Sequence, residues 1–184
     1  MPLMDVRYAE GSLDDAMKAK LAGLLTDVLI RMEGGANTRG GRAFAWVFFS
    51  AFAARDWWIG GEADATYVSP PGKFLVRITI PEGYMNTLHK NEVHAWVAEA
   101  IGEATATPGP GDSILTVIEE VTEGNWGCAG LPISLESIAA TVGQVGGERV
   151  LWSRRYFEAK ARAREAAGYP ADTGGLLPSL THSG

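Results

Sequence analysis

The amino-acid sequence predicts an α/β (α+β) fold: two fused β-α-β units forming one four-stranded mixed sheet, with two helices on one face and a C-terminal tail helix. Three observations lead to this fold. The apolar pattern repeats at a constant offset of 72 residues, each copy follows a strand-helix-strand order, and each copy closes with a glycine-rich turn, DWWIGG at 56–61 and NWGCAG at 125–130. The 184 residues are enough to bury one core of this size.

The repeat lies in the pattern of apolar positions more than in residue identity. It runs through the first strand of each unit and into the helix that follows. The aligned positions are Leu3 with Leu75, Val6 with Ile78, Glu10-Gly11 with Glu82-Gly83, Leu21 with Val93, Leu25 with Val97, and Leu29 with Ile101. A register that holds across two successive elements indicates a duplicated unit.

Each unit opens with a strand, which a Glu-Gly pair then ends. Apolar side chains alternate with others over residues 74–80, the period of a half-buried strand. In the first unit we expect Ser12 and Asp15 to form a capping box, since a hydroxyl and a carboxylate can satisfy free N–H groups at a helix start. The apolar stripe that follows, from Leu13 to Leu29, has helical spacing and predicts a helix packed on the sheet.

The second strand of the first unit is predicted after a glycine-rich segment. GGANTRGGR at 34–42 is expected to end the helix and form a flexible loop. AFAWVFFSAF at 43–52 is apolar on both faces and predicts a strand buried on both sides, with SILTVIEEV at 113–121 as its counterpart. A right-handed crossover then makes the two strands of each unit parallel. The face without helices needs a cover, for which we expect a subunit interface.

The predicted boundaries follow the repeat. The first unit with its hairpin spans 2–62, a linker containing Pro70-Pro71-Gly72 spans 63–72, the second unit spans 73–147, and the tail spans 148–184. In the tail, RRYFEAKARAREAAG predicts a helix, LPISLESIAATVGQ before it a shorter one, and residues 170–184 a frayed end. The tail carries six basic and four acidic side chains, so we expect it to dock on the acidic body or on a neighbouring subunit.

Composition excludes several classes of protein. The net charge of −6 argues against nucleic-acid binding, and the absence of a long apolar run or a secretory leader predicts a cytoplasmic protein without a membrane span. A single cysteine, Cys128, excludes an internal disulfide, and His89 and His94 lie five residues apart, on different faces of a helix. We therefore expect no metal and no cofactor.

The combination of a proline directly after the initiator methionine, a Glu-Gly pair after the first strand and an FGIGG-like hairpin at the end of the unit resembles the tautomerase superfamily (4-oxalocrotonate tautomerase-like). Its duplication is similar to the fused branch that includes the chloroacrylate dehalogenases and malonate semialdehyde decarboxylase. The resemblance covers residues 2–143. It implies a homotrimer and proton transfer at an enol or at a carbon beside a carbonyl, or addition of water to an activated alkene.

Pro2 is the predicted catalytic residue. Methionine is normally removed before a residue as small as proline, which leaves a secondary amine with a pKa near 8. At the edge of an apolar pocket the charged form is disfavoured, so the amine can act as a general base near neutral pH. Phe74 holds the equivalent place in the second unit and has no free amine, which leaves one such base per chain.

The chain departs from the family pattern where arginines hold a substrate carboxylate. Those positions carry Ser12 and Trp46 in the first unit and Tyr84 and Leu115 in the second. Two other arginines, Arg42 and Arg77, are candidate substrate-binding residues, with ordinary ion pairing as the competing interpretation.

Aromatic side chains stand near the predicted pocket instead. Trp57 and Trp126 occupy the hairpin position where relatives place an aromatic by the active site, and Asn125 precedes the second of them. A pocket poor in arginine and rich in tryptophan favours an apolar or aromatic small-molecule substrate. Asn125 can orient a carbonyl or a water but cannot act as a base.

Three hypotheses follow. The first is a cofactor-independent tautomerase or isomerase in which Pro2 moves a proton on a keto–enol substrate. The second is a lyase or hydratase, dehalogenase-like or decarboxylase-like, acting on an unsaturated or β-oxo acid. The third is a non-catalytic binding protein of the same fold, which applies if Met1 is retained and the proline nitrogen is an amide.

Overall fold

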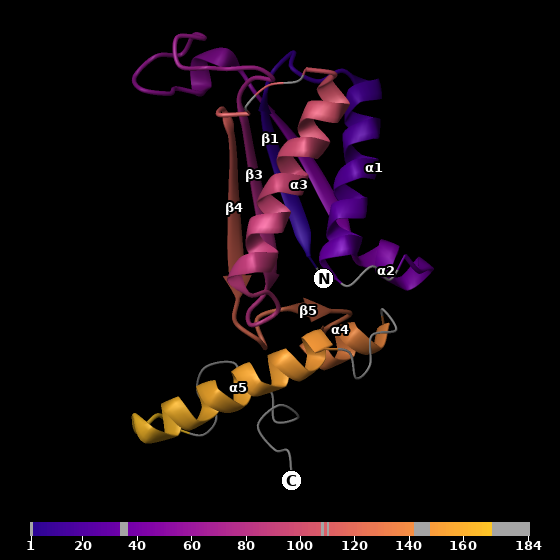
Figure 1. The fold of residues 1–184 in the computed structure, drawn as a ribbon, viewed down its shortest axis with the longest axis vertical. Helices are drawn as coiled ribbons and strands as arrows, with labels where there is room; N and C mark the ends of the chain where they lie inside the picture. Colours follow the sequence, from indigo (N-terminus) through magenta and orange to yellow (C-terminus); the bar gives the residue numbers. More distant parts are fainter. Residues whose placement is uncertain (1, 34–36, 108, 110, 142–147, 171–184) are drawn as a thin grey trace.

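The computed structural model describes residues 2–33, 37–107, 109, 111–141 and 148–170, and it is built around one four-stranded sheet (Figure 1). The strand order is β2-β1-β3-β4. The strands are β1 (Leu3–Ala9), β2 (Trp46–Phe52), β3 (Phe74–Pro81) and β4 (Ile114–Val121), with a short hairpin of β5 (Gly127–Cys128) and β6 (Leu131–Pro132). The helices are α1 (Asp15–Met32), α2 (Arg39–Phe44), α3 (Thr87–Thr105), α4 (Leu135–Thr141) and α5 (Glu148–Ala166), with a 3-10 turn, η1, at Ala54–Asp56.

The sheet is mixed, as predicted. β1 pairs with β2 and β3 with β4 in parallel, and β1 pairs with β3 antiparallel, with Leu3 opposite Thr79. Helices α1 and α3 pack against each other and cover one face of the sheet (Figure 1). The prediction of two β-α-β units sharing one sheet is therefore confirmed.

The main core lies between these two helices and the sheet. Alternate residues of β1 and β3 point toward the helices, so Met4, Val6, Val76 and Ile78 are all fully buried. They meet apolar side chains at helical spacing from α1 and α3. The most deeply buried of these helical residues are Leu21, Leu25, Leu29, Val93, Val97 and Ile101.

The other face of the sheet is open in the single chain. Trp46 and Phe48 in β2 are 49% and 48% exposed, and Leu115 in β4 is 62% exposed. We call Trp46, Phe48, Leu115 and Val117 the open face. The prediction that the 43–52 strand is buried on both sides is wrong for the isolated chain, because both long helices lie on the same face.

Helix capping also differs from the prediction of a Ser12–Asp15 capping box. Asp14 caps α1, because its side chain accepts a hydrogen bond of 2.7 Å from the Met17 N–H. Asn86 caps α3 in the same way, accepting a bond of 2.9 Å from the His89 N–H. The two caps are 72 residues apart, so the repeat extends to the start of each helix.

Part of the predicted glycine-rich loop is helical. Residues 34–36 lie outside the described residues, but α2 occupies the second half of the segment. The Thr38 hydroxyl caps it, accepting a hydrogen bond of 3.0 Å from the Gly41 N–H. A side-chain cap therefore outweighs the low helix propensity of two glycines over this short turn.

The predicted tail helix is present and is longer than predicted, since α5 begins at Glu148. It lies across the lower end of the sheet in Figure 1, beneath β5 and α4. The predicted frayed end from residue 171 onward is outside the described residues, and the unit boundaries stay predictions. Within the part of the chain that the structure describes, no helix is long and apolar enough to cross a membrane.

Replacing Ile101 by alanine should lower the free energy of unfolding by about 2–5 kcal/mol, because the side chain is fully buried between α3 and the sheet. Leu88→Ala is the matched control in the same helix, since Leu88 is 72% exposed and its loss should change stability by less than about 0.5 kcal/mol. Urea unfolding of both variants measures the difference. Equal losses would contradict the assigned packing of α3.

Candidate active site

Pro2 lies where the two units meet. Because β1 and β3 are antiparallel, the start of β1 stands beside the end of β3, and Leu3 opposite Thr79 puts Pro2 near Ile80. Pro2 is itself buried. The duplicated sheet thus places the predicted catalytic residue of the first unit against the second unit.

A small pocket surrounds Pro2. Its empty volume is about 190 Å³, including open solvent at its mouth. Besides Pro2, one lining residue is the last of α1 and one follows it directly, three come from the end of β3 and the turn after it, and two come from α4. The pocket is lined by Pro2, Met32, Glu33, Ile80, Pro81, Tyr84, Leu135 and Ile138, and we call it the Pro2 pocket.

Glu33 is the charged residue of this lining. It follows α1 directly and is only 4% exposed. Burial raises the pKa of the Glu33 carboxyl group above its usual value. Sequence reasoning missed this residue, because a glutamate between a helix and a glycine-rich segment has the pattern of a solvated surface position. Glu33 and α4 meet only in the folded chain.

Tyr84 occupies the place where the family pattern has an arginine after the second Glu-Gly pair. It is half-buried and packs against both the main core and a smaller apolar cluster of Leu135, Ile138 and Phe157. In the sequence, Tyr84 stands out only as a departure from the family pattern. The structure adds that this position faces Pro2 from the other unit.

Trp126 and Asn125 lie at the same end of the sheet as Pro2 but outside the pocket lining. Both follow β4 in the turn that leads to the β5–β6 hairpin, and Asn125 is exposed. Trp126 is half-buried, and its carbonyl accepts a hydrogen bond of 3.0 Å from the Ile133 N–H. Its indole N–H is buried and has no hydrogen-bond partner among the described residues.

The other three predicted residues are not brought to the Pro2 pocket within one chain. Trp57 follows β2, at the opposite end of the sheet, where it packs edge-to-face on Phe52 with ring centroids 5.9 Å apart. Arg42 on α2 forms an ion pair of 3.3 Å with Asp27. The substrate-binding roles of Trp57, Arg42 and Arg77 stay predictions.

Arg77 lies in the middle of β3 on the same side of the sheet as the open face. It is paired in register with Val117 of β4, and its guanidinium forms an ion pair with Glu119. Arg42 and Arg77 are thus both engaged in the ordinary ion pairs that formed the competing interpretation.

The described residues contain no group of three or more histidine, cysteine, aspartate or glutamate side chains placed to hold a metal ion. Cys128 is an exposed free cysteine in β5. His94 is exposed on α3 and His89 is half-buried near the start of that helix.

No family model matches the sequence, and no curated protein matches it. Solved structures match the fold. A wild-type fused 4-OT (4-oxalocrotonate tautomerase) in a symmetric trimer has a TM-score of 0.58 at 20% identity, covering 75% of this chain and 98% of its own. A native fused 4-OT has the same TM-score at 21% identity, covering 71% and 94%. N1, a member of the cis-3-chloroacrylic acid dehalogenase family, has a TM-score of 0.59 at 16% identity, covering 82% and 95%.

These structures define the class of fold: the chain has a mixed, duplicated β-α-β fold like that of the fused 4-OT and cis-3-chloroacrylic acid dehalogenase family structures, a tautomerase-like fold. Within it, the similarity extends both to fused tautomerases and to a dehalogenase-family protein, at identities that show the fold alone.

The raised pKa of Glu33 predicts a specific pH dependence of stability. The folded chain holds the proton more tightly than the unfolded chain, so stability falls as pH rises from the ordinary value of 4.5 through the raised pKa. Glu33→Gln cannot ionise and should remove this decline. Thermal unfolding between pH 4 and 7 should therefore show the difference in Tm, variant minus wild type, rising with pH.

Glu10→Gln is the control, since Glu10 is an exposed glutamate of the first Glu-Gly pair. Its Tm difference from wild type should stay nearly constant over this range. A Glu33→Gln profile parallel to that of wild type would contradict the burial of an ionisable carboxyl group in the Pro2 pocket.

Proposed function

We propose that the protein is a cofactor-independent tautomerase or isomerase in which the Pro2 amine transfers a proton on a keto–enol substrate. The observation that carries this proposal is the position of Pro2, buried in a largely apolar pocket where the two units of a tautomerase fold meet. The proposal requires removal of Met1, because an acylated proline nitrogen has no basic lone pair.

The proposed chemistry needs only one proton carrier. The amine takes a proton from the enol hydroxyl and the resulting pyrrolidinium returns a proton to carbon, so the substrate is isomerised with no net change in its atoms. An apolar surrounding lowers the amine pKa toward neutrality. Glu33 would accept a hydrogen bond from the pyrrolidinium, and the Tyr84 hydroxyl would donate one to the substrate oxygen.

The proposed substrate is apolar or aromatic. The Pro2 pocket is walled mainly by Met32, Ile80, Leu135 and Ile138, and its lining includes no arginine or lysine. Trp126 and Asn125 border the same end of the sheet and are kept as proposed substrate contacts, as is Arg42 on α2. Trp57 and Arg77 lie elsewhere in the chain, so a role for them at this pocket requires a second copy.

A lyase or hydratase is the second candidate, and Glu33 is the observation that favours it. A buried carboxyl group beside Pro2 could hold and activate a water molecule for addition to an unsaturated acid, a task that Asn125 cannot perform. The two candidates differ in whether water enters the product.

We also propose a homotrimer, assembled through the open face. Trp46, Phe48 and Leu115 expose large apolar areas there, which isolated chains rarely leave in water. The fused 4-OT structures with this fold are named as trimers.

Phe48→Lys should convert the trimer to a monomer, because a charge placed in an apolar interface is costly to desolvate. Leu88→Lys is the matched control, since Leu88 is also exposed and apolar but lies on α3. Sedimentation equilibrium of wild type and both variants measures the mass. A trimer that survives Phe48→Lys would contradict this interface, and a monomeric wild type would contradict the trimer.

Pro2→Ala should lower kcat/KM for the enol of phenylpyruvate by about 10²-fold or more, as expected for loss of a positioned general base. Ultraviolet absorbance follows the loss of enol. Pro132→Ala, at an exposed proline of β6, is the control and should react like wild type. Intact mass of the protein from its native host shows whether Met1 is removed.

Equal rates for wild type and Pro2→Ala would exclude a catalytic Pro2 for this substrate. A mass that retains Met1 would exclude the amine altogether and leave the binding-protein hypothesis.

A further inference from the structure

The two Glu-Gly pairs, identical in sequence and equivalent in the repeat, have different surroundings. Both glycines have positive φ, +85° at Gly11 and +75° at Gly83, and both glutamate N–H groups bond back to the end of the neighbouring parallel strand. Glu10 and Gly11 are exposed, and a Cβ at Gly11 would meet nothing within 4 Å. A Cβ at Gly83 would lie 2.6 Å from the Tyr156 ring.

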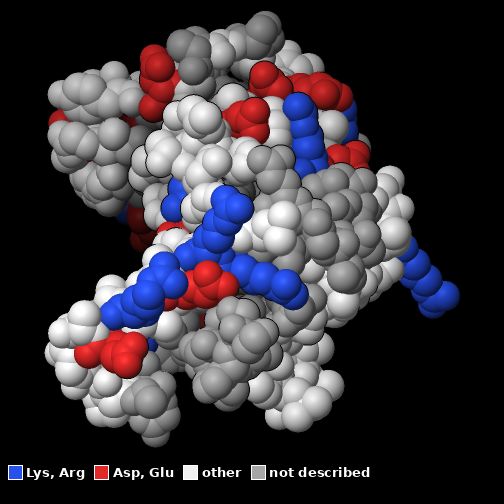
Figure 2. Space-filling model, turned by 60° about the horizontal axis from the view of Figure 1, so that its bottom comes forward, with Lys and Arg blue, Asp and Glu red and all other residues white. Residues whose placement is uncertain are grey.

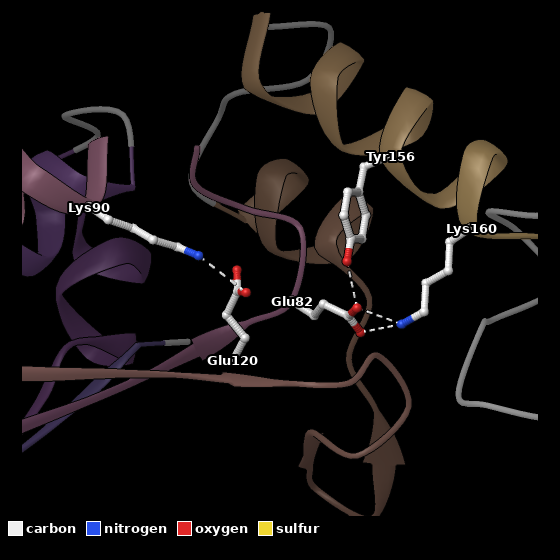
Figure 3. A network of polar contacts seen from close by, with 5 residues as sticks. All are labelled: Glu82, Lys90, Glu120, Tyr156 and Lys160. Carbon is white, nitrogen blue, oxygen red and sulfur yellow. Dashed lines mark hydrogen bonds and ion pairs between the residues drawn. The ribbon is translucent and has the colours of Figure 1, made fainter. Parts of the chain in front are cut away.

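The second pair holds α5. The Glu82 carboxylate accepts a hydrogen bond of 2.6 Å from the Tyr156 hydroxyl and forms an ion pair with Lys160 one turn further along the helix (Figure 3). The Ser153 hydroxyl donates a bond of 3.2 Å to the Gly83 carbonyl. We call these contacts of Glu82-Gly83 with Ser153, Tyr156 and Lys160 the tail clamp.

The polar part of the clamp is partly shielded from water. The Glu82 and Lys160 side chains are 15% and 19% exposed. Burial opposes ionisation of Glu82, but hydrogen bonds from Lys160 and Tyr156 outweigh it and hold the pKa of Glu82 below its usual value. Burial and the neighbouring carboxylate raise the pKa of Tyr156 to about 12. A shielded, charge-assisted contact of this kind contributes more than a surface ion pair.

The C-terminal segment is attached to the body separately from the main core. Leu135 and Ile138 of α4 and Phe157 of α5 form their own apolar cluster, and no residue of α4 or α5 belongs to the main core among the described residues. Figure 2 shows the end of the molecule that α5 covers, where basic side chains gather around an acidic one. A small cluster with a polar clamp can open locally while the main core stays folded.

The same segment forms one side of the Pro2 pocket. Leu135 and Ile138 form one wall of it, beside the buried Pro2. The Leu135 N–H is bonded to the Glu123 carboxylate at 3.0 Å, which ties the start of α4 to the turn after β4. Ile138 lies one turn further along α4 from that tie.

We propose that α4 and α5 form a lid over the Pro2 pocket, held shut by the tail clamp and opened to admit substrate. Opening breaks the contacts of Glu82-Gly83 with α5 and moves Ile138 away from Pro2. Substrate entry rests on the proposed function, but closure of the lid does not require catalysis.

Thiol labelling measures opening directly. In a Cys128→Ser background, Ile138→Cys places one thiol in the lid and Val97→Cys places one in the main core, and both sites are buried. Labelling by Ellman's reagent then reports the population of open chains when opening and closing are fast. Two substitutions test the tail clamp, Glu82→Gln and Gly83→Ala. Their matched controls are the same changes at the equivalent positions of the first unit, Glu10→Gln and Gly11→Ala.

Glu82→Gln should speed labelling at Ile138→Cys by about tenfold, the effect of one charge-assisted hydrogen bond, while Glu10→Gln leaves the rate unchanged. Gly83→Ala should speed labelling at Ile138→Cys more than Gly11→Ala does. Both substitutions strain a backbone with positive φ, but only the added Cβ at position 83 displaces the Tyr156 ring. Labelling at Val97→Cys should stay slow in every variant.

Equal rates within each matched pair would overturn the lid. Equal acceleration at Ile138→Cys and Val97→Cys would also overturn it, since the segment would then open only with the whole fold. The two proposals can fail separately. If Glu82→Gln speeds labelling at Ile138→Cys but Pro2→Ala does not slow enol turnover, the lid is supported and the proposed function is rejected.

Discussion

The antiparallel pairing of β1 with β3 is the constraint on which the rest of the structure depends. Each unit alone would be a parallel pair of strands with one helix, too small to bury a core. The β1–β3 ladder joins the two units into one sheet and sets α1 beside α3. It also brings the start of each unit against the end of the other, so any site at Pro2 must contain residues from both.

The two ends of the sheet are equivalent in the repeat but differ in the side chains that they carry. Phe74 is buried at the end of the sheet where Trp57 lies, whereas Pro2 lies just before β1 at the end where Tyr84 lies. The first Glu-Gly pair remains open to solvent and the second contacts α5. Among the described residues, the Pro2 end is therefore the one that combines a proline beside the first strand, a buried carboxyl group and contacts with α4.

The sequence was sufficient to predict the sheet, the parallel pairs and the two long helices, because a period-two strand and a helical stripe are local patterns that repeat in register. It was insufficient for the surroundings of Pro2. Glu33 is buried and lines one pocket with residues of α4 that lie about 100 positions further along the chain, and Tyr156 meets Glu82 across 74 positions. The Ser12 capping box was wrong because Asp14 competes for the same helix end.

The Pro2 pocket lies at the border between two packing units of unequal size. One side, Ile80 and Met32, belongs to the main core, where each side chain is held by many neighbours; the other, Leu135 and Ile138, belongs to the small cluster under α5. Tyr84 contacts both. A rigid wall can hold a proton carrier in a defined position, and a weakly attached wall can move without disturbing it. A site of the proposed kind at this border would meet both requirements, which neither packing unit could meet alone.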